Sequence, residues 1–201
     1  MRVSWLNRMS RVSRVMIATA SLLLVPVYFF PLWKIQLWAP QYPEGLSLSI
    51  WASKLTGDIT TVNILNHYIG MAPIAEANFP ELKMFPIAFA ALIGLGFVAI
   101  LIGRRFAAVG WAAGILSFSL WALYDFYQWE YRFGHDLNPD AAIKMDDMVY
   151  QPPLIGEKIF LNITATSWPE FAGYTFSFAC VLALFVMASE VLKKRPLHGD
   201  G

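Results

Sequence analysis

The sequence predicts an all-α integral membrane protein in which four helices span the bilayer. The first observation is composition: 57% of the 201 residues are apolar and only 14% are charged, whereas a soluble domain carries about 25% charged residues. The mean hydropathy is accordingly positive, at +0.50. The second observation is four separate stretches that reach the roughly 20 apolar residues needed to cross a membrane. They cover residues 15–33, 84–102, 106–127 and 171–192.

Each stretch is expected to be a helix because its apolar residues are continuous, whereas a membrane barrel needs many alternating strands. The first stretch follows a basic N-terminal segment but lacks a small-residue cleavage site after its apolar core, so we expect an uncleaved anchor. Pro26 and Pro31 are expected to bend this helix near its outer end. The whole chain, 1–201, is expected to form a single membrane domain.

The distribution of basic residues predicts the orientation. Nine of the fifteen lysines and arginines lie in short segments before the first helix, between the second and third, and after the fourth. The other six are spread over two long loops, 34–83 and 128–170. Both termini and the turn at Arg104 and Arg105 are therefore expected to be cytoplasmic. Both loops would face outward, into the periplasm if the protein lies in a bacterial inner membrane.

The two outer loops are the expected location of function, because a loop longer than about 15 residues in a compact protein usually has structure or a role of its own. In the first loop, Asp58 or Thr60 is placed to cap a helix that runs to about Ile69. Both loops are rich in apolar residues, so we expect them to pack into an ordered cap.

A copper site is one hypothesis for these loops. His67 and Met71 are four residues apart and would share a helix face, although Gly70 between them is placed to end the helix. The second loop adds His135, Met145 and Met148. Imidazole and thioether groups are suitable ligands for Cu(I). The alternative is that the histidines make ordinary hydrogen bonds and the methionines fill space in the packing.

A calcium loop is a weaker hypothesis for the second loop. Its acceptor residues are spaced like the ligands of such a loop: Asp136, Asn138, Asp140 and Asp147. However, Ala141 stands where a glycine is required, and the final ligand is Asp in place of Glu. A polar turn stiffened by Pro139 explains the same residues.

Acidic residues near the outer end of the third helix suggest a quinol or proton site. Asp125 and Glu130 lie close to membrane depth, where ionisable groups are functional candidates. An ion pair of Asp125 with Arg132 or Lys83 is the structural alternative. Glu190, near the inner end of the fourth helix, is expected to pair with the lysines at 193 and 194.

Several enzyme and cofactor signatures are missing from the sequence. It contains no CxxCH motif, and no histidine lies in a spanning stretch, so haem is not expected. It also lacks GxSxG, HExxH and phosphate-loop motifs. With a net charge of +1, nucleic acid is not an expected partner. A non-catalytic protein of the lipid bilayer is therefore favoured over an enzyme.

Four segments of the outer loops carry a resemblance to a known family. They are Tyr42-Pro43-Glu44-Gly45-Leu46, Asn66-His67-Tyr68-Ile69-Gly70-Met71, Gly134-His135-Asp136-Leu137-Asn138-Pro139 and Gln151-Pro152-Pro153-Leu154-Ile155-Gly156. Together they resemble the small integral membrane proteins encoded alongside bacterial nitrous oxide reductases of the second clade (NosB-like). The resemblance covers both outer loops and implies a role in denitrifying respiration, beside a periplasmic multicopper enzyme. It identifies no catalytic residues.

The sequence thus leads to a non-catalytic accessory protein of a periplasmic respiratory system. It would act through its outer loops, in copper handling and assembly or in docking a periplasmic or membrane redox partner. Two alternatives remain open. One is a quinol-interacting electron-transfer component, and the other is a structural subunit of a larger membrane complex.

Overall fold

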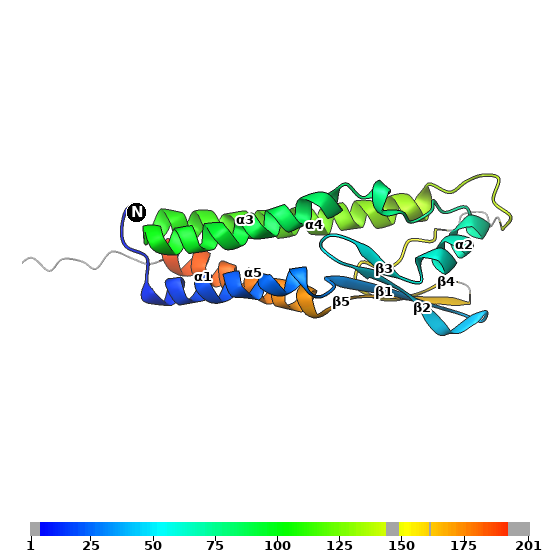
Figure 1. Cartoon of the computed structure of the whole chain (residues 1–201), viewed down its shortest axis with the longest axis horizontal. Helices are drawn as coiled ribbons and strands as arrows, with labels where there is room; N and C mark the ends of the chain where they lie inside the picture. The colour runs from blue at the N-terminus through cyan, green and yellow to red at the C-terminus, as the bar shows by residue number, and fades with distance from the viewer. Residues whose placement is uncertain (1–4, 144–148, 161, 193–201) are drawn as a thin grey trace, which may run out of the picture. The chain divides into compact units, whose positions relative to one another are not determined.

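The computed structural model describes residues 5–143, 149–160 and 162–192. The contacts divide the chain into two compact units, which are described separately (Figure 1). The helical unit comprises Met1–Val25, Ala88–Leu120 and Thr175–Gly201. The sheet unit comprises Pro26–Ile87 and Trp121–Tyr174.

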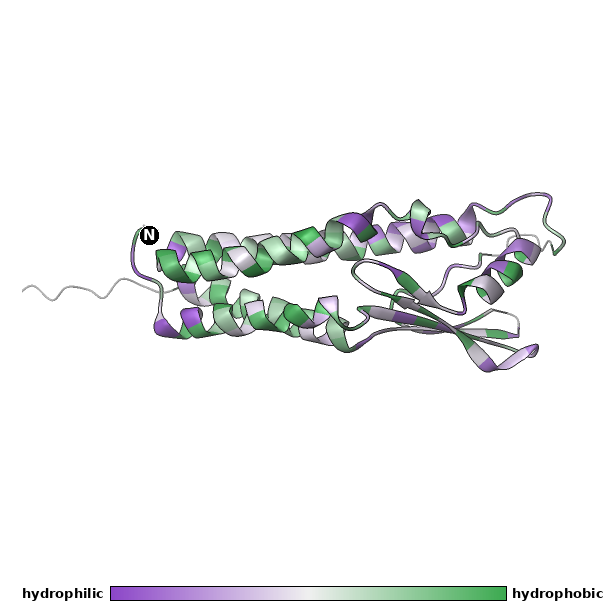
Figure 2. Cartoon of the chain, viewed as in Figure 1, coloured by the Kyte–Doolittle hydropathy of each residue, from purple (hydrophilic) through white to green (hydrophobic). Residues whose placement is uncertain are grey.

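The chain is a membrane protein, because the described residues contain four helical segments long and apolar enough to cross a bilayer. The first combines α1 (Arg11–Leu23) with the short 3₁₀ helix η1 (Val25–Tyr28). The others are α3 (Glu81–Ile102), α4 (Arg105–His135) and α5 (Phe171–Leu192). Apolar residues dominate these helices (Figure 2). Many remain exposed, such as Leu101 at 85%, as expected for side chains that contact lipid.

Three of the four spanning helical segments begin one to four residues earlier than predicted, at Arg11, Glu81 and Arg105, and two of the four end at a different residue. The first helical segment ends at Tyr28, not at residue 33. The α-helix itself ends at Leu23, shortly before Pro26, and Pro31 has no N–H to continue the helical hydrogen bonds after Tyr28. The third predicted helix continues eight residues past 127, to His135. Its polar residues lower the hydropathy there, but the helix persists because its aromatic side chains are packed within the sheet unit.

A buried polar network organises one end of the helical unit. The carboxylate of Glu190 is completely buried, accepts a hydrogen bond from the Ser10 backbone N–H at 2.9 Å, and lies 3.4 Å from Nε of Arg105. Ser13 Oγ donates to the same carboxylate. Glu190 therefore has partners on α1 and α4, whereas the lysines at 193 and 194 lie outside the described residues.

Backbone hydrogen bonds place the N-terminal segment against the α3–α4 turn. Met9 N donates to Gly103 O at 2.9 Å, and Arg105 N donates to Asn7 O at 3.0 Å. The basic N-terminal segment and the basic turn consequently lie at the same end of the helical unit.

The prediction of an all-α protein is wrong, because the described residues include a five-stranded antiparallel sheet in the order β3-β2-β1-β5-β4. The strands of the first loop are β1 (Trp33–Ala39), β2 (Tyr42–Ile50) and β3 (Leu55–Gly57). Those of the second loop are β4 (Gly156–Phe160) and β5 (Ile163–Pro169). In β1, buried Ile35 is flanked by the less buried Lys34 and Gln36. This is the alternation of a strand with one packed face.

The sheet joins the two long loops directly. Strand β1 pairs along its length with β5, for example Gln36 with Thr166 and Ile35 with Ser167. Since continuous strand pairing requires the strands to be adjacent, the two loops lie on the same side of the membrane.

The core of the sheet unit forms on one face of this sheet. Helix α2 (Ile59–Ile69) and the last turns of α4 pack against it. The buried cluster consists of Ile35, Leu46, Leu48, Leu55, Val62, Ile74, Leu82 and Trp129. Burial of each large apolar side chain contributes roughly 1.5–3 kcal/mol, so this cluster stabilises the arrangement of the two loops.

Helix α2 matches the sequence prediction at both ends. It ends before Gly70, which adopts the left-handed conformation with φ 81°. Asp58 occupies the position before the helix, but its carboxylate does not cap α2. It instead accepts hydrogen bonds from the backbone N–H and the hydroxyl of Ser47 on β2, at 2.8 and 3.2 Å.

Candidate functional site

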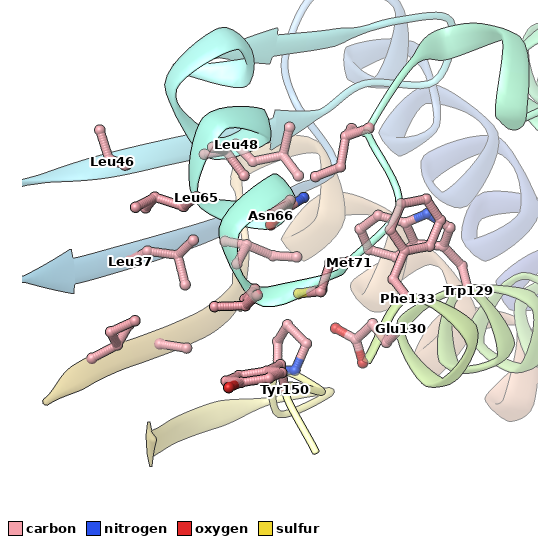
Figure 3. Close-up of a pocket in the computed structure, with 17 residues that line it drawn as sticks. Leu37, Leu46, Leu48, Leu65, Asn66, Met71, Trp129, Glu130, Phe133 and Tyr150 are labelled. Carbon is pink, nitrogen blue, oxygen red and sulfur yellow. The ribbon is translucent and has the colours of Figure 1, made fainter. Parts of the chain in front are cut away.

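A largely apolar cavity of about 80 Å³ lies within the sheet unit, between the sheet, α2 and the last turns of α4 (Figure 3). The strands contribute Ile35, Leu48 and Ala165 to its wall. Helix α2 contributes Val62 and Asn66. The second loop closes the cavity with Tyr150 and Pro152.

Glu130 is the acidic residue of this cavity. Its side chain is completely buried, and neither carboxyl oxygen has a hydrogen-bond partner among the described residues. The carboxyl group is directed into the cavity, toward Met71 and Tyr150 (Figure 3). Leaving a buried polar group unpaired costs about 1–3 kcal/mol, so this arrangement needs an explanation beyond packing.

The local sequence explains why an acid is placed here. Phe126, Trp129 and Phe133 recur at the spacing of one helix face and put Glu130 on the same side of α4. Their rings form a continuous cluster, with centroids 5.7 Å apart for Phe126 and Trp129 and 5.1 Å apart for Trp129 and Phe133. Phe79 adds a further edge contact to Trp129 at 5.2 Å. Packing of these aromatic rings draws Glu130 into the interior.

Two more buried polar groups lie around the cavity without a hydrogen-bond partner among the described residues. They are Nε1 of Trp129 and the hydroxyl of Tyr150. Sequence reasoning missed both because no motif marks them, and it named Asn66 only as part of a resembling segment and not as a site residue. The aromatic residues four before, one before and three after Glu130 were the available signal that its helix face is buried.

Asp125 does not share this cavity. It is five positions from Glu130, which places the two side chains on different faces of α4. Its charged neighbours are Glu81 and Arg132. Asp125 also shares a side-chain hydrogen bond with Glu81, and of the two basic residues expected as partners Arg132 is the one whose charge acts on it. The structure does not join Asp125 and Glu130 into one site.

A second pocket opens beside the end of α2. It is lined by His67, Gly70, Met71, Ala72, Pro73, Asp136, Leu137, Asn138 and Pro139. Backbone hydrogen bonds hold the two loops together here, from Asn138 N to Gly70 O at 2.8 Å and from Ile143 N to Tyr68 O at 2.9 Å. Residues that are distant in sequence thus converge on one opening.

The residues predicted as copper ligands do not all lie at this pocket. His67 and Met71 both line it. His135 stacks on Tyr131, with ring centroids 3.9 Å apart, and its Nδ1 lies 2.9 Å from the carbonyl oxygen of Tyr131. The described residues show no group of three or more His, Cys, Asp or Glu side chains arranged to hold a metal ion. Met145 and Met148 lie outside the described residues.

The calcium residues form a turn in the described part of the chain. Asp136 and Asn138 line the open pocket. The side-chain oxygen of Asn138 accepts a hydrogen bond from the Asp140 backbone N–H at 2.9 Å, which is the pattern of an Asx turn. The Asn138 oxygen has a second lone pair, so this bond does not decide the calcium hypothesis, and Asp147 lies outside the described residues.

Comparison with known proteins does not assign a family. A scan against protein-family models finds no match to the chain. A search of curated proteins also finds no match. What the fold and site define is a class: a membrane protein in which two long loops build an α+β unit with an internal cavity and an open pocket.

Proposed function

We propose that this chain is a non-catalytic accessory protein of a bacterial inner membrane, with both termini in the cytoplasm and the sheet unit in the periplasm. The excess of lysine and arginine in the short flanking segments supports this orientation. The hydrogen bonds between the N-terminal segment and the α3–α4 turn agree with it, because both basic segments lie at one end of the helical unit.

The proposed role is handling of Cu(I) at the open pocket of the sheet unit. The observation that carries the proposal is that His67 and Met71 line this pocket together with Asp136, which comes from the other loop. An imidazole and a thioether are soft ligands that suit Cu(I). A pocket open to the periplasm would allow the ion to be passed to a partner.

A respiratory partner is the second part of the proposal. The loop segments resemble those of membrane proteins encoded beside nitrous oxide reductases, whose periplasmic copper centres must be assembled or supplied with electrons. All four resembling segments contain residues of the open pocket or of the cavity wall. The pocket residues are therefore the ones that we expect to meet such a partner.

The cavity does not favour the quinol alternative. An apolar cavity of roughly 150 Å³ is known to hold a benzene ring, whereas the cavity around Glu130 measures about 80 Å³. A substituted quinone ring is larger than benzene, so the size of this cavity gives the quinol alternative no support.

Titration of the detergent-solubilised full chain with Cu(I), against a competing chelator, tests the copper proposal. We expect stoichiometric binding that is lost in His67→Ala and weakened in Met71→Leu. His135→Ala is the matched control and should leave binding unchanged, since His135 stacks on Tyr131 and does not line the pocket. Absence of Cu(I) binding, or equal loss in both histidine variants, would contradict the assignment to this pocket.

A further inference from the structure

The carboxyl group of Glu130 is completely buried among mainly apolar side chains. Packing alone does not explain why a carboxyl group occupies this position. The cavity wall is built mainly from aliphatic and aromatic side chains, so it offers the carboxyl group no charge partner among the described residues. Buried carboxyl groups in proteins are normally paired, and one without a partner is held in its neutral form. In the helical unit Glu190 follows this rule, with Arg105 and Ser13 beside it, whereas Glu130 does not.

We infer that this cavity is a binding site for a small organic ammonium ion, with Glu130 as its anionic anchor. An ammonium group supplies the positive charge and the hydrogen-bond donors that stabilise the ionised carboxylate in an apolar cavity, where the unpaired group is otherwise neutral. A charge-assisted hydrogen bond of this kind is about twice as strong as a neutral one. The unpaired carboxylate aimed into the cavity and the apolar wall around it together define the chemical class of the ligand.

The wall of the cavity suits the rest of such a ligand. Trp129, Phe133 and Tyr150 all line it, and aromatic faces attract organic cations. Leu48 and Val62 provide aliphatic surface for an alkyl chain. A metal ion is a poor candidate, because hard cations need several oxygen ligands and Glu130 supplies the only carboxylate among the residues that line the cavity.

The size of the cavity limits the ligand. Benzene occupies an apolar cavity of roughly 150 Å³. By the same proportion, a cavity of about 80 Å³ holds about three or four nonhydrogen atoms. n-Propylammonium is of this size, whereas tetraethylammonium is too large. 1-Propanol has nearly the same shape as n-propylammonium but carries no charge.

The test is a titration of the detergent-solubilised full chain with propylammonium chloride at constant ionic strength, followed by calorimetry. We expect saturable binding, and 1-propanol should bind at least about tenfold more weakly, since hydrogen bonds to charged groups contribute about 1.5–3 kcal/mol. Tetraethylammonium should not bind. These comparisons use the unaltered protein and need no variant to fold.

Two variants locate the site. Glu130→Gln should weaken propylammonium binding at least about tenfold. Glu157→Gln, which changes an exposed carboxylate on β4, should leave it unchanged. No saturable binding, equal binding of 1-propanol, or full binding by Glu130→Gln would each overturn the inference. Met71 lines both the cavity and the open pocket, but His67 lines the open pocket and not the cavity, so loss of Cu(I) binding in His67→Ala and loss of propylammonium binding in Glu130→Gln can occur separately.

Discussion

Replacement of Glu130 by methionine should stabilise the protein in the absence of ligand. Methionine has nearly the shape of glutamate, and its thioether needs no hydrogen bond in an apolar wall. The substitution removes a buried carboxyl group that has no partner among the described residues. Mutational data put the cost of such a group at about 1–3 kcal/mol, so we expect the free energy of unfolding to rise by about this amount.

Thermal unfolding of the full chain in detergent, followed by tryptophan fluorescence, measures the effect. Trp129 is buried beside the cavity and reports on the sheet unit. For a chain of about 200 residues, 1 kcal/mol shifts Tm by about 2–4 °C, so Glu130→Met should raise Tm by about 2–12 °C. Glu157→Met at the exposed β4 position is the control and should change stability by less than about 0.5 kcal/mol.

A fall in Tm for Glu130→Met would refute this reasoning, because it would mean that the carboxyl group has a stabilising partner in the folded protein. A rise would mean that the acid is retained at a cost to stability. Residues that lower stability are expected at functional sites. A rise in Tm would therefore agree with Glu130 being the anchor of the ammonium site.

Two further substitutions should destabilise the protein, and the same unfolding assay checks them. Glu190→Ala leaves Arg105 without its buried partner at 3.4 Å and should cost about 3–5 kcal/mol; an unchanged Tm would show that the network contributes nothing. Gly57→Ala should cost about 1–3 kcal/mol, because Gly57 has φ +113° and an added Cβ would lie 2.1 Å from the Ser47 carbonyl oxygen. A neutral result there would contradict the pairing of β2 with β3.

The membrane helices were largely predictable because hydropathy is a local property. The fourth predicted helix, 171–192, coincides with α5. The third predicted helix, 106–127, is too short. Polar residues such as Gln128 and Arg132 end the apolar stretch in the sequence, although the helix continues to His135. Its last turns depend on packing within the sheet unit, which the local composition does not reveal.

The sheet was missed for a different reason. Strand β1 shows alternation in its own sequence, around Ile35, but its partner β5 begins at Ile163 in the other loop. Pairing over that separation is a tertiary property, and each loop alone is compatible with a helical cap. Helix α2 was predictable because Gly70 provides a local stop signal.

The candidate site was predictable only in part. The ligand chemistry of His67 and Met71 marks them in the sequence, and both line one pocket in the structure. Glu130 was chosen for its position near membrane depth, but its cavity forms from strands, helices and a loop that no single segment encodes. The separation of His135 from the open pocket likewise depends on its stacking on Tyr131.

The central claim is that the two long loops build one unit on one side of the membrane, and a disulfide cross-link tests it most directly. Gln36 and Thr166 are direct partners across β1 and β5, within the roughly 4.4–6.8 Å between Cα atoms that a disulfide spans. In a Cys180→Ser background, Gln36→Cys with Thr166→Cys should oxidise to an intrachain disulfide, detected by peptide mass spectrometry.

The control pair is Gln36→Cys with Glu157→Cys. Glu157 pairs with Thr166 on its far side and lies two strands, or about 10 Å, from Gln36. The account predicts a cross-link in the first pair and none in the second. Failure of the first pair to cross-link, or equal cross-linking of both pairs, would contradict the shared sheet and with it the unit on which both proposed sites depend.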